Sequence, residues 1–582
     1  MMQRRVFLTG AVAVAVAGAG LFSGCEAVRS PDPAQAREAD LVIYGSSPAA
    51  IAAAIQARRM GKTAVVVSPE TRIGGLTTGG LGQTDIGNKS AFGGIALEFY
   101  RAVAAHYRDP AHWTRQPSTE YSPDGQCFGT KGADAMWTFE PSAALSILEG
   151  WEKRDALEIV RGERLDRGPG GVEKRDGRIV AFRTLSGKVF RGKMFVDATY
   201  EGDLMAAAGV SYFVGREANA VYGETISGYA PTARGAQNHQ FEPGVSPYVT
   251  PGDRASGLLP GVEPYDPQAK PGDGDRRVQA YCFRMCLTDL DENRIPFKKP
   301  ASYRAEDYEL LVRNLVAQER RHPEWKDSRT LGLPWINSKM PNRKTDTNNR
   351  TAFSTDFIGG NWSWPEGSYE ERERLLKAHL DYQRGLMWTL ANDPRIPARI
   401  RTEVARWGTC KDEFTDGLGD GWQRQLYVRE ARRMVGAYVM TERHCRGSEK
   451  APHPVAMGAY GMDSHNCRRL ETKDGFVRNE GNVEDYVAED GKSRFPPYGV
   501  DYGAIVPKRT DCVNLFVPVC LSASHMAYGS IRMEPVFFAL GQAAGTAAAL
   551  AIDADVPVQD VDYACLAARL KVDGQVFMNP HP

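Results

Sequence analysis

The chain is short of the features that mark several classes of protein. Its 72 basic and 72 acidic residues leave no net charge, which argues against a nucleic-acid partner. Its ten cysteines include no C-x-x-C pair, so we predict neither a metal site nor a dithiol redox centre. Beyond the N-terminus we expect no segment of transmembrane length.

The N-terminus predicts export. Residues 3–8 read Gln-Arg-Arg-Val-Phe-Leu and resemble a twin-arginine signal, and the apolar stretch 11–21 is too short to span a bilayer. Phe22-Ser-Gly-Cys25 resembles a lipoprotein processing site, with Cys25 either lipidated or discarded with the signal. The resemblance implies a periplasmic or cell-envelope protein that touches the membrane only through a lipid anchor.

A strand–helix–strand pattern follows. Residues 41–44 are a short apolar run typical of a buried parallel strand, Pro48 suits the first turn of a helix, and residues 63–67 form a second β-branched strand. The N-terminus of such a helix points backbone N–H groups at a phosphate. The pattern predicts a dinucleotide-binding unit.

The nucleotide fingerprint in this unit is degenerate. G-x-G-x-x-G appears as Gly45-x-Ser47-x-x-Ala50, which leaves a phosphate-free α/β unit as the alternative. An acidic residue is expected after the second strand to hold the ribose, but Ser68 stands there and Glu70 follows. Either Glu70 reaches back, or Ser68 and water replace the acid.

Glycine pairs at 74–75 and 79–80 let the backbone pass close to a planar ligand. From here the chain resembles the FAD-dependent oxidoreductases with a glutathione-reductase-like FAD fold. Residues 195–203 resemble the family's strand that ends in an Ala-Thr turn over the cofactor. Residues 514–519 and 540–547 resemble its last strand and its small-residue helix. The candidate FAD-binding residues are Gly45, Ser47, Pro48, Ala49, Ser68, Glu70, Gly74, Gly75, Thr78, Gly79, Gly80, Asp197, Ala198, Thr199, Gly541, Gln542 and Ala543.

The resemblance implies an α/β fold. We expect a three-layer, Rossmann-like FAD/NAD(P)-binding domain with a parallel sheet, interrupted by an inserted α+β substrate domain. The expected boundaries are a signal at 1–25, a linker at 26–39, the FAD-binding domain at 40–215 and 491–582, and the insert at 216–490. We predict a strand at 278–287, a helix from the Ser368-x-x-Glu371 capping box, a helix at 427–442, and a last helix beginning near Leu540.

Two short segments carry the candidate catalytic residues. His525 can act as a general base, Arg532 can bind an anionic or carbonyl oxygen, and Tyr528 can donate to a substrate hydroxyl. The alternative is that His525 satisfies buried backbone groups. His465 is the fourth candidate, paired with Asp463 as a base or, equally, part of a turn that satisfies its own backbone.

These residues predict an exported FAD-dependent oxidoreductase. The polar candidate cleft favours a small polar substrate, a sugar or another polyol, with hydride transfer to flavin N5. One alternative is a CH–CH dehydrogenase or reductase similar to the fumarate-reductase-like flavoproteins, in which Arg532 moves the proton. Another is a non-catalytic, glycan- or partner-binding lipoprotein on a flavoprotein scaffold. The electron acceptor stays open.

Overall fold

The computed structural model describes residues 36–129, 132–328, 331–488, 490–492 and 494–578. The predicted export signal, the lipidation site at Cys25 and most of the predicted linker lie outside these residues. The linker prediction is wrong at its end, because strand β1 begins at Ala36, where it pairs with Val189.

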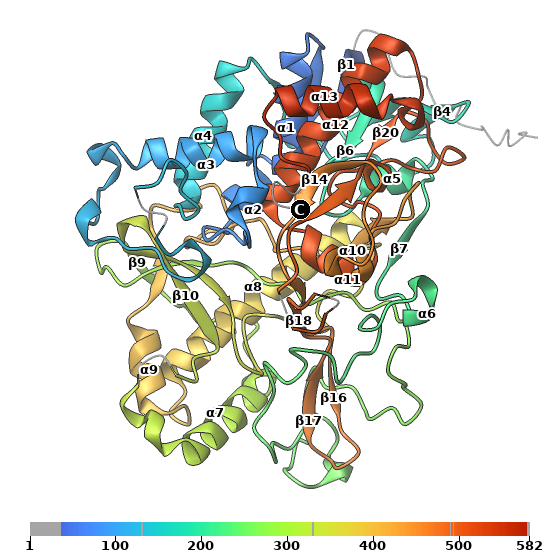
Figure 1. The fold of residues 1–582 in the computed structure, drawn as a ribbon. Coiled ribbons are helices and arrows are strands. Elements are labelled where there is room, and N and C mark those ends of the chain that lie inside the picture. The colour runs from blue at the N-terminus through green and yellow to red at the C-terminus, as the bar shows by residue number, and fades with distance from the viewer. Residues whose placement is uncertain (1–35, 130–131, 329–330, 489, 493, 579–582) are drawn as a thin grey trace, which may run out of the picture.

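A seven-stranded sheet of order β3-β2-β1-β6-β5-β4, with β20 beside β6, forms the nucleotide-binding part (Figure 1). Its strands are β1 (Ala36–Tyr44), β2 (Ala64–Val67), β3 (Glu158–Val160), β4 (Val172–Arg175), β5 (Arg178–Arg183), β6 (Val189–Asp197) and β20 (Leu515–Phe516). β1, β2, β3, β6 and β20 pair in parallel, and β4 and β5 add an antiparallel edge. The predicted return of a late strand to the first half is confirmed, because Leu515 pairs with Phe195.

Both faces of this sheet are covered, as expected for an α/β fold. Along β1, Leu41 and Ile43 belong to one hydrophobic cluster and Val42 and Tyr44 to another, so the two faces bury separate cores. The helices of this part are α1 (Pro48–Arg59), α2 (Gly75–Thr78), α3 (Gly94–His106), α4 (Pro141–Arg154), α5 (Asp203–Ala207), α11 (His525–Ile531), α12 (Glu534–Ala554) and α13 (Tyr563–Val572).

Helix α12 joins the two ends of the chain. It begins at Glu534 rather than near Leu540, and it runs beside α1 (Figure 1). By length and composition α12 could cross a membrane, contrary to our expectation from the sequence, although 89% of its most apolar window is buried in the protein. A Cβ added at Gly541 would lie 2.3 Å from the carbonyl oxygen of Ala49. The small residues of α1 and α12 therefore serve close helix packing.

Gly541→Ala is expected to lower the free energy of unfolding by about 1–3 kcal/mol, because the added methyl overpacks this contact. Gly150→Ala is the matched control: Gly150 lies in α4 and nothing comes within 4 Å of an added Cβ, so we expect a gain of about 0.5–1 kcal/mol. Denaturant unfolding measures both. Equal stabilisation of the two variants would contradict the close approach of the helices.

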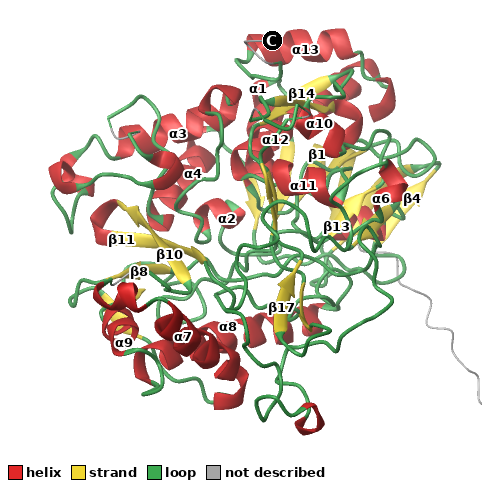
Figure 2. Cartoon of the chain, turned by 60° about the horizontal axis from the view of Figure 1, so that its bottom comes forward, coloured by secondary structure: helices red, strands yellow, loops and turns green. Residues whose placement is uncertain are grey.

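The middle of the chain carries a five-stranded sheet of order β10-β11-β8-β12-β9, beside α7, α8 and α9 (Figure 2). Its elements are β8 (Cys286–Thr288), β9 (Arg294–Pro296), β10 (Trp335–Met340), β11 (Lys344–Asn349), β12 (Gly408–Cys410), α7 (Glu309–Arg321), α8 (Tyr369–Asn392) and α9 (Ala398–Ala405). The helix predicted from the Ser368 cap is confirmed, since the Ser368 hydroxyl accepts a hydrogen bond from the Glu371 N–H.

Four strand pairs and two short helices complete the described strands and α-helices. The pairs are β7 (Tyr212–Val214) with β13 (Arg432–Met434), β14 (Pro454–Gly458) with β19 (Tyr498–Asp501), β15 (Met462–Ser464) with β18 (Val483–Asp485), and β16 (Arg468–Glu471) with β17 (Val477–Glu480); the helices are α6 (Asn219–Tyr222) and α10 (Glu442–Arg446).

Two predictions in the middle of the chain are wrong. The helix predicted at 427–442 is wrong over 427–434, an extended segment that contains β13, because its arginines pair with distant carboxylates in addition to the local Arg433–Glu430 pair. Arg432 pairs with Asp203 and Arg433 with Glu217. The strand predicted at 278–287 is regular only from Cys286, and its earlier residues make isolated bridges.

Candidate functional site

A pocket with a cavity volume of about 100 Å³ opens at the carboxyl ends of β1 and β6. Gly45 follows β1 with φ +122°, and a Cβ there would lie 2.5 Å from the carbonyl group of Ala198. The Ser47 hydroxyl donates to the same carbonyl oxygen at 2.7 Å. The turns after β1 and β6 are thus held together, and both line the pocket at the N-terminus of α1. That arrangement suits a phosphate.

The walls of the pocket fit the ADP half of FAD. Of the predicted residues they include Gly45, Ser47, Glu70, Ala198 and Thr199, and they add Arg164, Tyr369, Arg372 and Arg424, which the sequence did not single out. The Glu70 carboxylate pairs with Arg424 at 3.0 Å in the place where a ribose acceptor is needed. Burial raises the pKa of Glu70, against the opposing effect of Arg424 and Arg164.

Several predicted cofactor residues shape the backbone of this region. Ser68 bonds the main chain of Glu70 with its hydroxyl. Asp197 accepts hydrogen bonds from the N–H groups of Thr199 and Met205, and burial raises the pKa of Asp197 to about 6. These carboxylate bonds fix the turn between β6 and α5.

Other predicted cofactor residues have packing roles in the described structure. Pro48 and Ala49 form the first turn of α1, where Ala49 faces Gly541. Gln542 accepts a hydrogen bond from the Ile95 N–H at 2.8 Å, and Ala543 is fully buried. Direct contact of Gly541, Gln542 and Ala543 with FAD stays a prediction.

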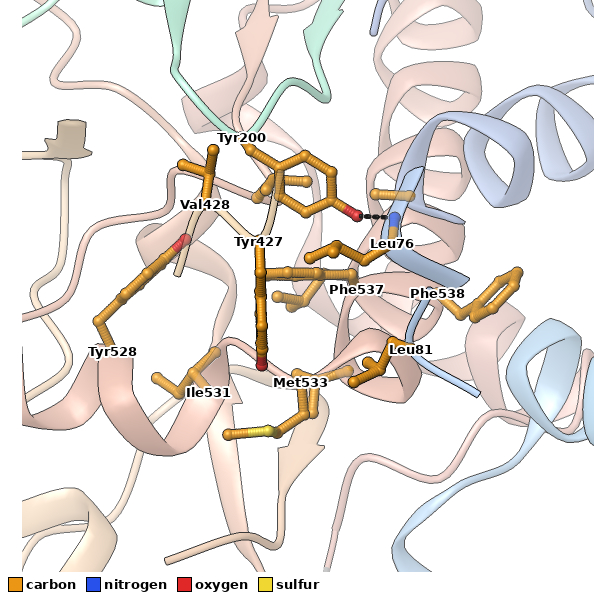
Figure 3. Close-up of a cluster of buried hydrophobic side chains, with 14 of the residues drawn as sticks. Leu76, Leu81, Tyr200, Tyr427, Val428, Tyr528, Ile531, Met533, Phe537 and Phe538 are labelled. Atoms are coloured by element: carbon orange, nitrogen blue, oxygen red, sulfur yellow. Dashed lines mark hydrogen bonds between the residues drawn. The ribbon is translucent and has the colours of Figure 1, made fainter. Parts of the chain in front are cut away.

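The glycine-rich segment leads from the pocket to a buried aromatic cluster. Gly74, Gly75 and Thr78 belong to α2 and its N-cap. A Cβ at Gly79 would collide with Gln425, and one at Gly80 with Arg284 and Gln423. Figure 3 shows Leu76 and Leu81 of this segment beside Tyr200, Tyr427, Tyr528, Ile531, Met533, Phe537 and Phe538.

Glu534 is the buried acid of this cluster. Its carboxylate accepts hydrogen bonds from the Thr77 hydroxyl at 2.8 Å and the Tyr200 hydroxyl at 3.0 Å, and that tyrosine oxygen accepts from the Leu76 N–H (Figure 3). Burial raises the pKa of Glu534 to about 7, although these hydrogen bonds lower it. Glu534 therefore ties the start of α12 to α2 and to the turn after β6.

Because the folded pKa of Glu534 exceeds its ordinary value of 4.5, its contribution to stability is full below pH 4.5 and is lost as pH rises through about 7. Glu534→Gln should remove that loss. Between pH 4.5 and pH 8, the fall in unfolding free energy should shrink by about 3 kcal/mol in the variant. Denaturant unfolding at both pH values measures it, and an unchanged pH dependence would show that Glu534 is charged in the folded protein.

Three guanidinium groups surround Tyr427. Those of Arg284, Arg429 and Arg532 lie 5.6, 4.5 and 5.8 Å from the ring centroid. Arg532 also donates to the Tyr427 hydroxyl at 3.0 Å and pairs with Asp463 at 3.2 Å. Burial works against the charge of Arg532, but Tyr427 and Asp463 hold its pKa above the ordinary arginine value. All three cations lie in a desolvated place, where charges interact more strongly than they do in water.

His465 lies beside the same cluster, and its two ring nitrogens have carboxylate neighbours at different distances. Nδ1 lies 2.7 Å from an Asp356 carboxylate oxygen, and Asp356 pairs in turn with Arg429 at 2.9 Å. Nε2 lies 3.6 Å from Asp463, beyond a normal hydrogen bond. Burial opposes the charge of Asp356, yet Arg429 and His465 lower the pKa of Asp356 to about 2. The orienting carboxylate is Asp356, whereas the sequence had suggested Asp463.

His525 and Tyr528 lie on α11, and Arg532 is the residue at which that helix ends. His525 is 1% exposed and both of its ring nitrogens are engaged, Nδ1 with Glu430 at 2.9 Å and Nε2 with the Ser464 hydroxyl at 3.1 Å. Both partners are side chains, whereas the alternative reading of the sequence expected buried backbone groups, and a catalytic role for His525 stays a prediction. Burial raises the pKa of Tyr528, which is 2% exposed. The structure thus brings His465 and Arg532 together around Asp463.

The fold and the pocket define an α/β protein with a nucleotide-binding type of site. The sequence matches the family described as "FAD dependent oxidoreductase" over residues 40–570, so the chain belongs to that family, binds FAD and is an enzyme. No curated protein matches it. Among the residues that the structure describes, no group of three or more histidine, cysteine or acidic side chains could hold a metal ion.

Solved structures of other flavoenzymes show distant similarity to parts of the chain. A flavin-containing monooxygenase from Stenotrophomonas maltophilia is 16% identical with a TM-score of 0.18, over 31% of this chain and 42% of that one. Bacillithiol disulfide reductase from Staphylococcus aureus is 12% identical with a TM-score of 0.18, over 36% of this chain and 45% of that one. The chain thus spans less than half the length of these proteins.

Proposed function

We propose that this FAD-dependent oxidoreductase oxidises a hydroxyl-bearing carbon of a small polar substrate, such as a sugar or another polyol. The observation that supports the proposal is the Asp356–His465 pair beside Arg532. Bound FAD supplies the acceptor for the hydride, at flavin N5. The residues of this chain supply binding, orientation and the transfer of one proton.

Each side chain has a defined part in this proposal. His465 Nε2 takes the hydroxyl proton, because Asp356 holds Nδ1 and leaves Nε2 as the acceptor. Arg532 and Arg429 stabilise the oxygen as it changes from hydroxyl to carbonyl, since their charges are buried and fixed. Tyr427 positions Arg532 through its hydroxyl. The substrate loses one proton and one hydride and becomes a carbonyl compound.

A CH–CH dehydrogenase or reductase is the second candidate. Its support is the burial of Arg532 beside Asp463, which suits an arginine that moves a proton. The two candidates differ in which side chain is essential. Loss of flavin reduction in an Arg532→Lys variant alone would favour CH–CH chemistry, and loss in a His465 variant would favour hydroxyl oxidation.

Anaerobic bleaching of the bound flavin tests the proposed reaction. The purified protein is mixed with a panel of sugars, polyols, saturated acids and simple alcohols, and the loss of absorbance near 450 nm is followed. We expect bleaching by polyhydroxylated compounds and the appearance of one carbonyl per flavin reduced. Bleaching by saturated acids alone, with a new C=C bond in the product, would overturn the hydroxyl chemistry.

We also propose that the protein works in the cell envelope, held by a lipid on Cys25. The support is the Arg4-Arg5 pair and the short apolar stretch that precedes Cys25. Export leaves oxygen, a quinone or a periplasmic carrier as electron acceptors, and small molecules rather than nucleic acids as partners. Cell fractionation of an R4K/R5K variant tests the route, and unchanged envelope location would contradict it.

A further inference from the structure

A second pocket, with a cavity volume of about 570 Å³, lies in the middle part of the chain and shares no lining residue with the nucleotide pocket. Its walls are rich in aromatic rings, contributed by Tyr303, Tyr308, Phe353, Phe357, Trp362 and Tyr382. These rings come from three separate stretches of chain, yet Tyr303 stacks on Tyr308 and Phe357 on Tyr382. Such a wall suits a flat apolar ligand.

One buried cation, Arg469, also lines this pocket. Its side chain bonds neutral oxygens only, those of Asn479 at 3.0 Å and Ala352 at 3.4 Å. Its guanidinium lies 4.7 Å from the Phe353 ring, and the residue is 5% exposed. Among the residues that the structure describes, Arg469 forms no ion pair. Burial lowers the pKa of Arg469 to about 10, so it is charged at neutral pH.

The acidic residues of the pocket are already neutralised by other cations. Asp307 pairs with Arg304 and Asp381 with Lys377. Glu263 pairs with Arg277 and Arg468. None of these carboxylates is paired with Arg469. A buried charge without a counter-ion is costly, and an anionic ligand would remove that cost.

We propose that this pocket binds an aromatic carboxylate, with its carboxylate on Arg469 and its ring among the aromatic side chains. The Nη1 atom of Arg469 lies 3.9 Å from a Cβ position at Gly261, another lining residue, so this end of the guanidinium borders the pocket wall. The absence of a side chain at Gly261 leaves that approach open. The site is separate from the proposed oxidation chemistry and does not depend on it.

The site includes residues that are close in sequence to both members of the His465–Asp356 pair. Arg469 lies four residues after His465, and its Ala352 partner precedes Asp356.

Calorimetric titration of the holoprotein with 2-naphthoate and with its neutral analogue 2-naphthamide tests the proposal. We expect the acid to bind about 10- to 100-fold more tightly than the amide, because only the acid forms a charge-assisted hydrogen bond with the guanidinium. R469Q should abolish that preference. R101Q removes an exposed cation of α3 that does not line the pocket, and it should leave the preference unchanged.

A378L supplies an independent variant, since it fills the pocket wall and leaves Arg469 in place. It should weaken binding of 2-naphthoate at least about 10-fold, so the test stands even if R469Q does not fold. The flavin spectrum and the Tm monitor folding of each variant. Equal affinity for acid and amide, no binding of either probe, or binding unaffected by A378L would each overturn the proposal.

Discussion

His465→Asn is expected to slow flavin reduction by substrate about 10²- to 10⁴-fold, the contribution typical of a positioned proton acceptor. The asparagine amide occupies the place of Nδ1 and can still donate to Asp356, so the fold around Arg429 is kept. What is lost is Nε2, the atom that faces Asp463 and Arg532 across the cluster. Anaerobic stopped-flow absorbance at saturating substrate measures the rate.

His525→Asn is the matched control, because it too can keep a hydrogen bond from the Nδ1 position, here to Glu430. If His525 only holds α11 in place, the variant reduces its flavin within about 10-fold of the natural rate. Both variants must retain FAD for the comparison to be valid. A normal rate in His465→Asn together with a large loss in His525→Asn would reverse the two assignments.

The balance of charges around Tyr427 explains why Arg532 can stay buried. Arg284 pairs with Asp346, Arg429 with Asp356 and Arg532 with Asp463, so each cation has its own carboxylate. Burial opposes the charge of Asp463, but His465, Arg532 and Arg429 lower the pKa of Asp463 to about 2. The three pairs form a fixed polar environment that needs little reorganisation when charge develops on a substrate oxygen.

The nucleotide half of the protein could be predicted because its signals are local. Three signals lie within one short stretch: the apolar run at 41–44, Pro48, and the strand at 64–67. They predict a strand, the start of a helix and a second strand, in that order. The α8 helix is similar, since the Ser368 cap stands directly before it. Hydrophobic periodicity and capping residues determine the structure of only the few positions around them, so they can be read from a short stretch of sequence.

The catalytic geometry could not be predicted, because its partners are far apart in sequence. Asp356 stands 109 residues before His465, and no spacing rule joins them. The segment at 427–434 shows the same limit. Arginines at a helical interval suggested a helix, but long-range pairs with Asp203 and Glu217 hold Arg432 and Arg433 in an extended chain. Tertiary contacts override a local pattern of this kind.

Gly45→Val is expected to weaken FAD binding more than about 100-fold and to give a colourless protein. Gly45 has φ +122°, which a β-branched residue adopts only with strain, and the new side chain would meet the carbonyl group of Ala198 at 2.5 Å. Relief of that clash requires the turns after β1 and β6 to separate, and both turns line the nucleotide pocket. The ratio of absorbance at 450 nm to that at 280 nm measures the flavin content.

Gly61→Ala separates this effect from general damage. Gly61 also has a positive φ, +76°, but nothing comes within 4 Å of an added Cβ, and it lies between α1 and β2, at the far end of α1 from the pocket. The variant therefore introduces left-handed backbone strain without a collision, and it should keep its flavin. If both variants lose FAD together, strain in the α1 unit is responsible. If Gly45→Val keeps its flavin, the nucleotide lies elsewhere, and the role given to the β1–α1 turn is wrong.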